Sequence, residues 1–187
     1  MGLASRAKLD IAALMAAYDF SGAAIVADVG GGNGGLLSAI LNHYPNISGL
    51  LFDLAPAIDA AKAGKGGPLS RCEFVVGDFF DNIPTGADIY ILKLVLHDWE
   101  DDKVERILTR CRNAMSPSSR LLVIEGLVGA PDEMSLTTIV DITMLIATGG
   151  RERTQVEFDK LLERSGLRLQ KVFPTESALY ILEATLA

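Results

Sequence analysis

Short, continuously apolar runs alternate with segments of helical periodicity along most of the chain. Because a strand buried on both faces needs no polar side, such runs predict a parallel sheet covered by helices on both faces. Two further runs, residues 168–173 and 179–186, are separated by only a short turn. That turn is too short for a parallel crossover, so it predicts an antiparallel hairpin. The first five apolar runs are residues 23–29, 49–54, 73–78, 88–96 and 121–126.

Helices are predicted between these runs where apolar residues recur three and four positions apart. The last predicted helix begins with a capping box from Thr154 to Glu157 and ends at Gly166. The alternation predicts an α/β fold with a doubly wound, seven-stranded, mostly parallel sheet and an antiparallel C-terminal hairpin strand. The predicted helices are residues 4–18, 36–44, a short one from Pro56, 101–115, 134–147 and 154–164.

Composition narrows the class of protein. The chain has 187 residues, of which 49% are hydrophobic, enough for one domain with its own core. Acidic residues number 24 against 17 basic ones, which argues against nucleic acid as a partner because phosphate binding needs a basic face. No apolar run reaches the about 18 residues of a membrane span. Cys72 and Cys111 lack metal-type spacing, and we expect free thiols in the cytoplasm.

A glycine-rich loop follows the first predicted strand and precedes a helix. Gly30, Gly32 and Gly35 match the G-x-G-x-x-G pattern of nucleotide-binding loops. Asp53 ends the next strand, and its acceptor-only carboxylate suits a ribose diol. In this context we expect an adenosine-containing ligand at the carboxyl ends of the strands. The alternative is that the glycines only form a tight turn.

The charge beside this loop separates two adenosine ligands. Asp28 precedes the loop, and no Lys or Arg lies between residues 9 and 61. A nicotinamide cofactor would bring a pyrophosphate here, whereas S-adenosylmethionine brings an ammonium and a sulfonium, which a carboxylate attracts. We therefore expect S-adenosylmethionine. After the third strand, Asp78 could accept from the adenine amino group and Phe79 could stack on the ring, although an ordinary turn with a core Phe would have the same sequence.

One of the two histidines is a candidate base. His97 follows the fourth apolar run, beside Asp98 and Trp99, at the edge where parallel sheets bind ligands. His43 lies in a predicted helix without such neighbours, and we expect it to be structural. A surface or capping role for His97 is the alternative.

Taken in order, these motifs resemble the plant caffeate-type and bacterial polyketide-type S-adenosylmethionine-dependent O-methyltransferases, a class I-type family. HDW and GGRERT are far more specific than the glycine loop. The resemblance runs from about Tyr18 to the C-terminus and implies a Rossmann-like methyltransferase domain over residues 21–187, with residues 1–20 as a linker helix. The motifs are DVGGGNGG, FDLAPAI, GDFF, LKLVLHDWEDD, LLVIEGLV and TMLIATGGRERTQVEF.

The family's own architecture adds one expectation. Its members are homodimers that normally carry an N-terminal winged-helix-like domain, which dimerises and helps to wall the acceptor pocket. Only about twenty residues precede the first predicted strand here, so we expect a catalytic domain without that N-terminal part.

Carried over by motif position, the resemblance implies a role for each candidate residue. His97 would be the general base that removes the acceptor hydroxyl proton, with Glu125 and Glu152 flanking and orienting its imidazole. Asp141 and Met144 would contact the acceptor. No metal is implied. The residues implied to line the cofactor site are Asp28, Gly30, Gly32, Asp53, Leu54, Asp78, Phe79, Lys93 and Trp99.

The two glutamates have other interpretations. Glu125 could be a strand-end residue that faces water. Glu152 could be a solvated loop charge in a surface ion-pair cluster with Arg151 and Arg153.

The expected function is therefore an S-adenosylmethionine-dependent O-methyltransferase of secondary metabolism, acting on a hydroxyl of an aromatic or polyketide-like small molecule and releasing S-adenosylhomocysteine. One alternative is a catalytically impaired S-adenosylmethionine-binding domain, in which Leu3, Leu14 and Tyr18 would form an exposed apolar stripe. A nicotinamide-dependent oxidoreductase is the other.

Overall fold

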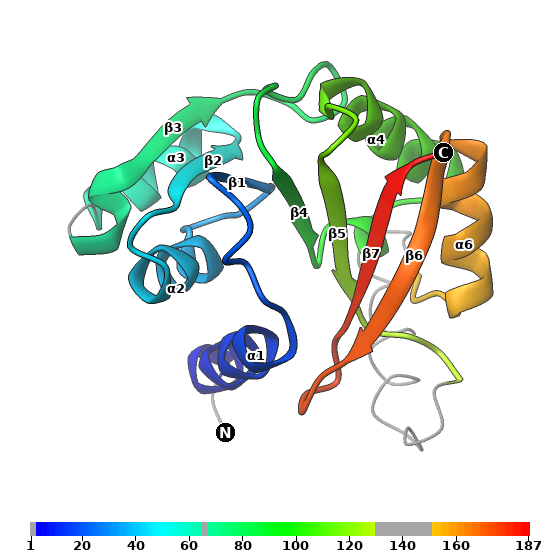
Figure 1. Ribbon diagram of the computed structural model, residues 1–187, viewed down its shortest axis with the longest axis horizontal. Coiled ribbons are helices and arrows are strands. Elements are labelled where there is room, and N and C mark those ends of the chain that lie inside the picture. The colour runs from blue at the N-terminus through cyan, green and yellow to red at the C-terminus, as the bar shows by residue number, and fades with distance from the viewer. Residues whose placement is uncertain (1–2, 65–66, 130–150) are drawn as a thin grey trace.

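A sheet of seven strands in the order β3-β2-β1-β4-β5-β7-β6 organises the computed structural model (Figure 1). The structure describes residues 3–64, 67–129 and 151–187. Strands β1 to β5 are mutually parallel, β7 is antiparallel to β5, and β6 is antiparallel to β7. The doubly wound sheet and its C-terminal hairpin are confirmed. The strands are β1 (Ile25–Val29), β2 (Ser48–Asp53), β3 (Cys72–Val76), β4 (Ile89–Lys93), β5 (Arg120–Glu125), β6 (Leu167–Pro174) and β7 (Tyr180–Leu186).

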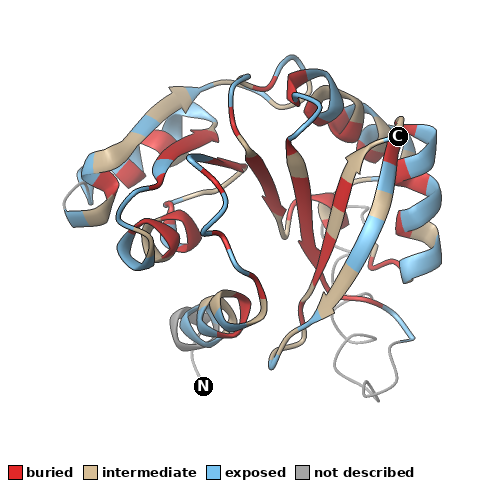
Figure 2. Ribbon diagram, in the orientation of Figure 1, coloured by how far each residue is buried: buried red, intermediate tan, exposed pale blue. Residues whose placement is uncertain are grey.

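Helices cover both faces of the sheet. Helices α1 to α3 contribute to the core on one face, and α4 and α6 to the core on the other. Burial is highest in the central strands and on the helix sides that face them (Figure 2). None of the described helices is long and apolar enough to cross a membrane. The helices are α1 (Leu3–Ala17), α2 (Gly35–His43), α3 (Ala55–Ala63), α4 (Asp101–Ala114) and α6 (Gln155–Arg164), with short 3-10 turns η1 (Gly67–Arg71) and η2 (Leu96–Asp98).

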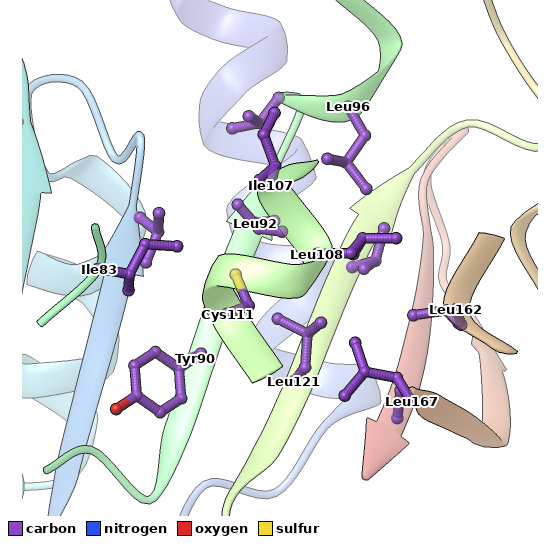
Figure 3. Packing of buried hydrophobic residues seen from close by; sticks show 14 of the residues in the cluster. Ile83, Tyr90, Leu92, Leu96, Ile107, Leu108, Cys111, Leu121, Leu162 and Leu167 are labelled. Atoms are coloured by element: carbon purple, nitrogen blue, oxygen red, sulfur yellow. The ribbon is translucent and has the colours of Figure 1, made fainter. Parts of the chain in front are cut away.

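Alternate residues of the central strands supply the two core layers. In β4, Ile89 and Ile91 pack on the side of α1 to α3, whereas Tyr90 and Leu92 pack on the side of α4 and α6. Figure 3 shows the second layer, in which Cys111 of α4 faces the strands. The Tyr90 hydroxyl, which would otherwise be buried without a partner, donates to a carbonyl at the end of α4.

Two sequence expectations are wrong in detail. The fourth strand was expected over residues 88–96 but ends at Lys93, because Leu94 takes a left-handed conformation with φ of 53° and turns the chain into η2. Leu14 and Tyr18 do not form an exposed stripe, since both are buried against the sheet. The helix predicted over residues 134–147 lies outside the described residues.

The two-sided core predicts a large cost for truncating a central strand. Leu122 of β5 is fully buried, so Leu122→Ala loses packing and leaves a cavity. We expect the free energy of unfolding, measured by urea denaturation, to fall by about 2–5 kcal/mol. Leu9→Ala is the control, because the Leu9 side chain is 54% exposed, and its cost should stay within about 0.5 kcal/mol. Equal losses in the two variants would contradict this description of the core.

Candidate active site

The glycine loop joins β1 to α2 at the point where the strand order reverses, which is where ligands bind in sheets of this kind. Gly31 permits a close approach, since a Cβ there would lie 2.5 Å from Cγ of Asp28. Gly32 has φ of 59°, a backbone conformation that residues other than glycine rarely adopt. The loop therefore needs glycine for space at one position and for backbone conformation at the next.

Asp53 connects this loop to the end of β2. One of its carboxylate oxygens accepts from the Gly32 N–H at 2.8 Å, and the other accepts from the Leu54 N–H at 2.7 Å. The carboxylate is thus fixed at the edge of the site, while Leu54 itself is 56% exposed. The structure brings Asp53, Leu54 and the loop together, as the sequence predicts.

A cleft of about 120 Å³ lies under the loop and is lined by Asp28 and Lys93. Asp28 is buried, and that burial, together with the charge of Asp53, raises the pKa of Asp28 to about 7, against the opposing effect of the Lys93 ammonium. Ala7 and Ile11 of α1 form another part of the wall. The cleft therefore combines an apolar wall with a buried carboxyl group.

An aromatic cluster closes the neighbouring part of the site. The ring centroids of Phe80 and Trp99 are 4.9 Å apart, and those of Phe79 and Trp99 are 6.2 Å apart, all with edge-to-face geometry. Asp78 stabilises the turn by accepting from the Phe80 N–H at 2.8 Å. A Cβ on Gly30 would lie 3.7 Å from the Phe79 ring, so the cluster borders the glycine loop.

His97 lies in η2 with its side chain only 11% exposed. Its Nδ1 is 3.3 Å from Oε1 of Glu152 and 3.6 Å from Oε2 of Glu125. Its Nε2 is 3.6 Å from Oδ1 of Asp98. Because carboxylates only accept, the contact with Glu152 favours the tautomer that carries its proton on Nδ1. Nε2 then holds the lone pair, which is what a base needs.

The charges around the imidazole raise its pKa. Burial alone would lower the pKa of His97, but the hydrogen bond to Glu152 and the charges of Glu125 and Asp98 outweigh it and raise the pKa above the ordinary 6.5. Burial also raises the pKa of Glu125, opposed by the charge of His97. The group of side chains around His97 therefore stabilises the imidazolium form.

Both glutamates are buried, so the interpretations that placed them in water are wrong. Glu125 is fully buried at the end of β5, and its Oε1 accepts from the backbone N–H groups of Val95 and Leu96 at 3.0 and 2.8 Å. Glu152 is 6% exposed. Arg153 is fully buried as well. It pairs with Asp101, which Arg151 also contacts while it pairs with Glu157.

Two further residues contribute to the site, although nothing in the sequence marks them as part of it. Arg153 donates to the backbone of the His97 turn, although arginine is usually exposed. Gly126 leaves room for Glu152, because a Cβ there would lie 3.1 Å from Oε2 of that glutamate. The proposed acceptor contacts Asp141 and Met144 lie outside the described residues.

The side chains of His97, Glu125 and Glu152 lie close enough together to be considered as ligands of a metal ion. Donor atoms of His97, Glu125 and Glu152 lie within 4.8 Å of one another. However, Nδ1 of His97 already faces the two carboxylates, and Oε1 of Glu125 is occupied by two N–H groups. The contacts are thus those of an imidazole held by two neighbouring carboxylates.

The geometry predicts that Glu152 sets the pKa of His97. Glu152→Gln keeps the shape and an acceptor oxygen but removes the charge, so the pKa of His97 should fall toward 6.5. Proton NMR titration can follow it, because the chain has only two histidines and the exposed His43 serves as a reference. Glu163→Gln on the surface of α6 is the control. An unchanged His97 titration in Glu152→Gln would contradict the role given to this carboxylate.

Comparison with known proteins places the chain in a family. The O-methyltransferase domain family matches residues 1–168. The mitomycin biosynthesis 6-O-methyltransferase of Streptomyces lavendulae is 49% identical over 162 residues, which are 85% of this chain and 46% of that protein. The solved structure of the mitomycin 7-O-methyltransferase MmcR superimposes with a TM-score of 0.91 and 44% identity over 96% of this chain and 53% of its own.

A third relative was solved with bound ligands. The O-methyltransferase NcsB1 from neocarzinostatin biosynthesis, solved with S-adenosylmethionine and 2-hydroxy-5-methyl naphthoic acid, has a TM-score of 0.84 and 37% identity over 98% of this chain and 57% of its own. The chain spans about half the length of the proteins it matches. Sequence, fold and family match agree: the chain belongs to the O-methyltransferase family.

Proposed function

We propose that the chain is the catalytic domain of an S-adenosylmethionine-dependent O-methyltransferase, which methylates a hydroxyl of an aromatic or polyketide-like small molecule and releases S-adenosylhomocysteine. The observation that carries the proposal is the position of His97, which Glu125 and Glu152 contact, after β4, the strand next to the one that leads into the glycine loop. The relatives support this substrate class, because one is the mitomycin biosynthesis 6-O-methyltransferase and another was solved with 2-hydroxy-5-methyl naphthoic acid.

The residues of the cleft fit the proposed cofactor. Asp28 is a buried carboxyl group with a raised pKa, so a cationic ligand that keeps it ionised gains attraction that a pyrophosphate would not. Gly31 lets the loop pack closely against the Asp28 side chain, and Asp53 retains acceptor capacity for a ribose diol. When bound, S-adenosylmethionine supplies an electrophilic methyl group on its sulfonium. The nicotinamide alternative is disfavoured by the carboxyl group under the loop.

The other cofactor residues would hold the adenosine and the amino-acid part. Phe79 and Trp99 offer ring surfaces beside the loop, with Asp78 and Leu54 at the exposed edge. Lys93 lines the cleft together with Asp28 and would bind a carboxylate. The position of each side chain and the family pattern support these assignments.

His97 would take the acceptor proton on Nε2. A phenol has a pKa of about 10, so even the raised pKa of His97 leaves a gap, and the proton must move as the oxygen attacks. Once protonated, the imidazolium is stabilised by Glu152 and Glu125 on the Nδ1 side and by Asp98 at 3.6 Å on the Nε2 side. The carboxylates therefore orient the base and lower the energy of its charged form.

Several further assignments remain predictions. Asp141 and Met144 as acceptor contacts, residues 1–20 as a linker into the domain of residues 21–187, the homodimer through an N-terminal domain and the expected absence of a metal are proposed on the family resemblance. A cytoplasmic location is proposed on the cysteine content, and the expected absence of nucleic acid and of a membrane partner on the acidic composition and the lack of a long apolar run. Methyl transfer that is unchanged by EDTA would support the metal-free expectation.

Cofactor binding gives the first test. S-adenosylhomocysteine at 100-fold excess over its Kd should add about 2.7 kcal/mol to the free energy of unfolding, measured by thermal shift. Gly31→Ala should abolish this gain, because its Cβ would lie 2.5 Å from Cγ of Asp28. Gly64→Ala is the matched control, since a Cβ there meets nothing closer than 3.7 Å. No stabilisation of the unsubstituted protein at millimolar ligand would contradict the proposed cofactor.

Removal of the base gives the second test. His97→Gln should retain the stabilisation by S-adenosylhomocysteine but lose about 10²–10⁴-fold in kcat, the usual contribution of a positioned base. Turnover of the unsubstituted protein should rise with pH through a pKa above 6.5, because only the neutral imidazole accepts a proton and the pKa of His97 is raised.

The control for this test is His43→Gln, which should keep both turnover and pH profile. If His97→Gln retains full kcat and the same pH profile, His97 is not the base and methyl transfer depends on proximity alone.

A further inference from the structure

Arg153 is a charged side chain with no exposed surface, and the proposed reaction gives it no task. Its Nη1 donates to the carbonyl of Leu96 at 3.0 Å, and its Nη2 donates to the carbonyl of Trp99 at 2.7 Å. Nε and Nη2 also donate to Oδ1 of Asp101 at 3.0 and 2.8 Å. A further bond runs from Nη1 to the carbonyl of Arg151 at 3.3 Å. All three nitrogens of the guanidinium are therefore engaged.

These contacts enclose the turn that carries His97. Leu96 precedes the histidine directly and Trp99 follows two residues later, so one planar group holds both ends of η2. A guanidinium presents its donors in a rigid fork, which fixes the distance between the two carbonyls it binds. The flexible ammonium of a lysine cannot hold both carbonyls with the same geometry.

The opposite side of the turn is held by Glu125. Its carboxylate accepts from the N–H groups of Val95 and Leu96, so the peptide groups of Leu96 are bound by a buried anion at the N–H and by a buried cation at the carbonyl. The turn is held between two charged groups from different parts of the chain.

The backbone of Arg153 is itself fixed to the end of β5. Arg153 forms an isolated parallel bridge with Leu127, and its carbonyl accepts from the Val128 N–H at 3.1 Å. The preceding residue is Glu152, whose carboxylate contacts the His97 ring. Consecutive residues thus contact the side chain of the histidine and the backbone of its turn.

We propose that Arg153 is a positioning residue for His97: without touching substrate or cofactor, it sets the backbone of the turn so that the imidazole meets Glu152 and Glu125 and presents Nε2 outward. The inference rests on the proposed function in taking His97 as the base. A purely structural role explains it less well, because a buried ionic group is often replaced by apolar residues without loss of stability.

The first test uses Arg153→Lys, which keeps the positive charge and changes only the geometry. If the turn loosens, His97 loses its carboxylate contacts and its pKa falls toward 6.5 in the NMR titration, while His43 stays constant. Loss of the positive charge of Arg153 alone would raise the pKa of His97. A fall in this pKa therefore indicates that the imidazole has lost its position beside the carboxylates. With an acceptor such as a hydroxynaphthoic acid, kcat should fall about 10²-fold.

Arg151→Lys is the matched control. Arg151 is a nearby arginine and binds the same Asp101, but its side chain is 40% exposed and, within the described residues, pairs with Asp101 and Glu157 rather than with the His97 turn. Arg151→Lys should leave the pKa of His97 unchanged and kcat within about twofold of that of the original protein. Trp99 adds a reporter, since it is the single tryptophan: iodide should quench its fluorescence more strongly in Arg153→Lys.

If Arg153→Lys does not fold, as judged by far-ultraviolet circular dichroism, Asp101→Ala provides the test of the proposal. It removes the carboxylate that holds the guanidinium, and Asp102→Ala removes an exposed charge from the same first turn of α4. Only Asp101→Ala should raise the quenching of Trp99 and lower kcat.

The proposal is overturned if a folded Arg153→Lys keeps the original His97 titration and kcat, if Arg151→Lys has the same effect, or if Asp101→Ala and Asp102→Ala are equivalent. Failure of the proposed function is separate. A protein that methylates no acceptor would still show the His97 shift and the Trp99 quenching if Arg153 positions the turn.

Discussion

A carboxylate buried without solvent contact at the end of β5 is the constraint on which the site depends. Isolated burial of such a charge costs several kcal/mol, so it must be compensated by donors or by opposite charge. Glu125 obtains this from two backbone N–H groups and from the imidazole of His97. The chain after β4 must therefore turn toward Glu125, which places the histidine at the edge of the sheet.

This turn also connects the base to the glycine loop. A Cβ on Gly30 would lie 2.9 Å from Cγ2 of Val95, and Val95 is one of the residues that Glu125 holds. Lys93 ends β4 and lines the cleft with Asp28. The cleft and the base thus share one short segment, residues 93–97, and a displacement of that segment affects both. Alignment of two reactants requires such a shared rigid element.

The sequence predicts the architecture because the same pattern, an apolar run followed by a segment of helical periodicity, is repeated along the chain. Apolar runs of strand length alternate with helical periodicity, and a glycine loop followed by an acidic strand end has few structural explanations. His97 is found by its place after a strand. These signals are local, and the structure agrees with them.

The remainder depends on contacts between distant segments. The run from Asp88 to Leu96 is apolar apart from Asp88 and Lys93, and nothing in it marks the left-handed Leu94 that follows the end of β4. Arg153 looks like a surface residue because arginine normally is one, and its burial becomes evident only when the Leu96 and Trp99 carbonyls are seen around it. The need for glycine at position 126 comes from the side chain of Glu152, which lies against it although it is 26 positions away in the sequence.

The most direct test of the account is a crystal structure of the protein with S-adenosylhomocysteine and a phenolic acceptor. The account predicts the acceptor oxygen within about 2.6–3.2 Å of Nε2 of His97, with Nδ1 still facing Glu152 and Glu125. An acceptor bound with its hydroxyl away from His97, or a cofactor outside the cleft that Asp28 and Lys93 line, would contradict it.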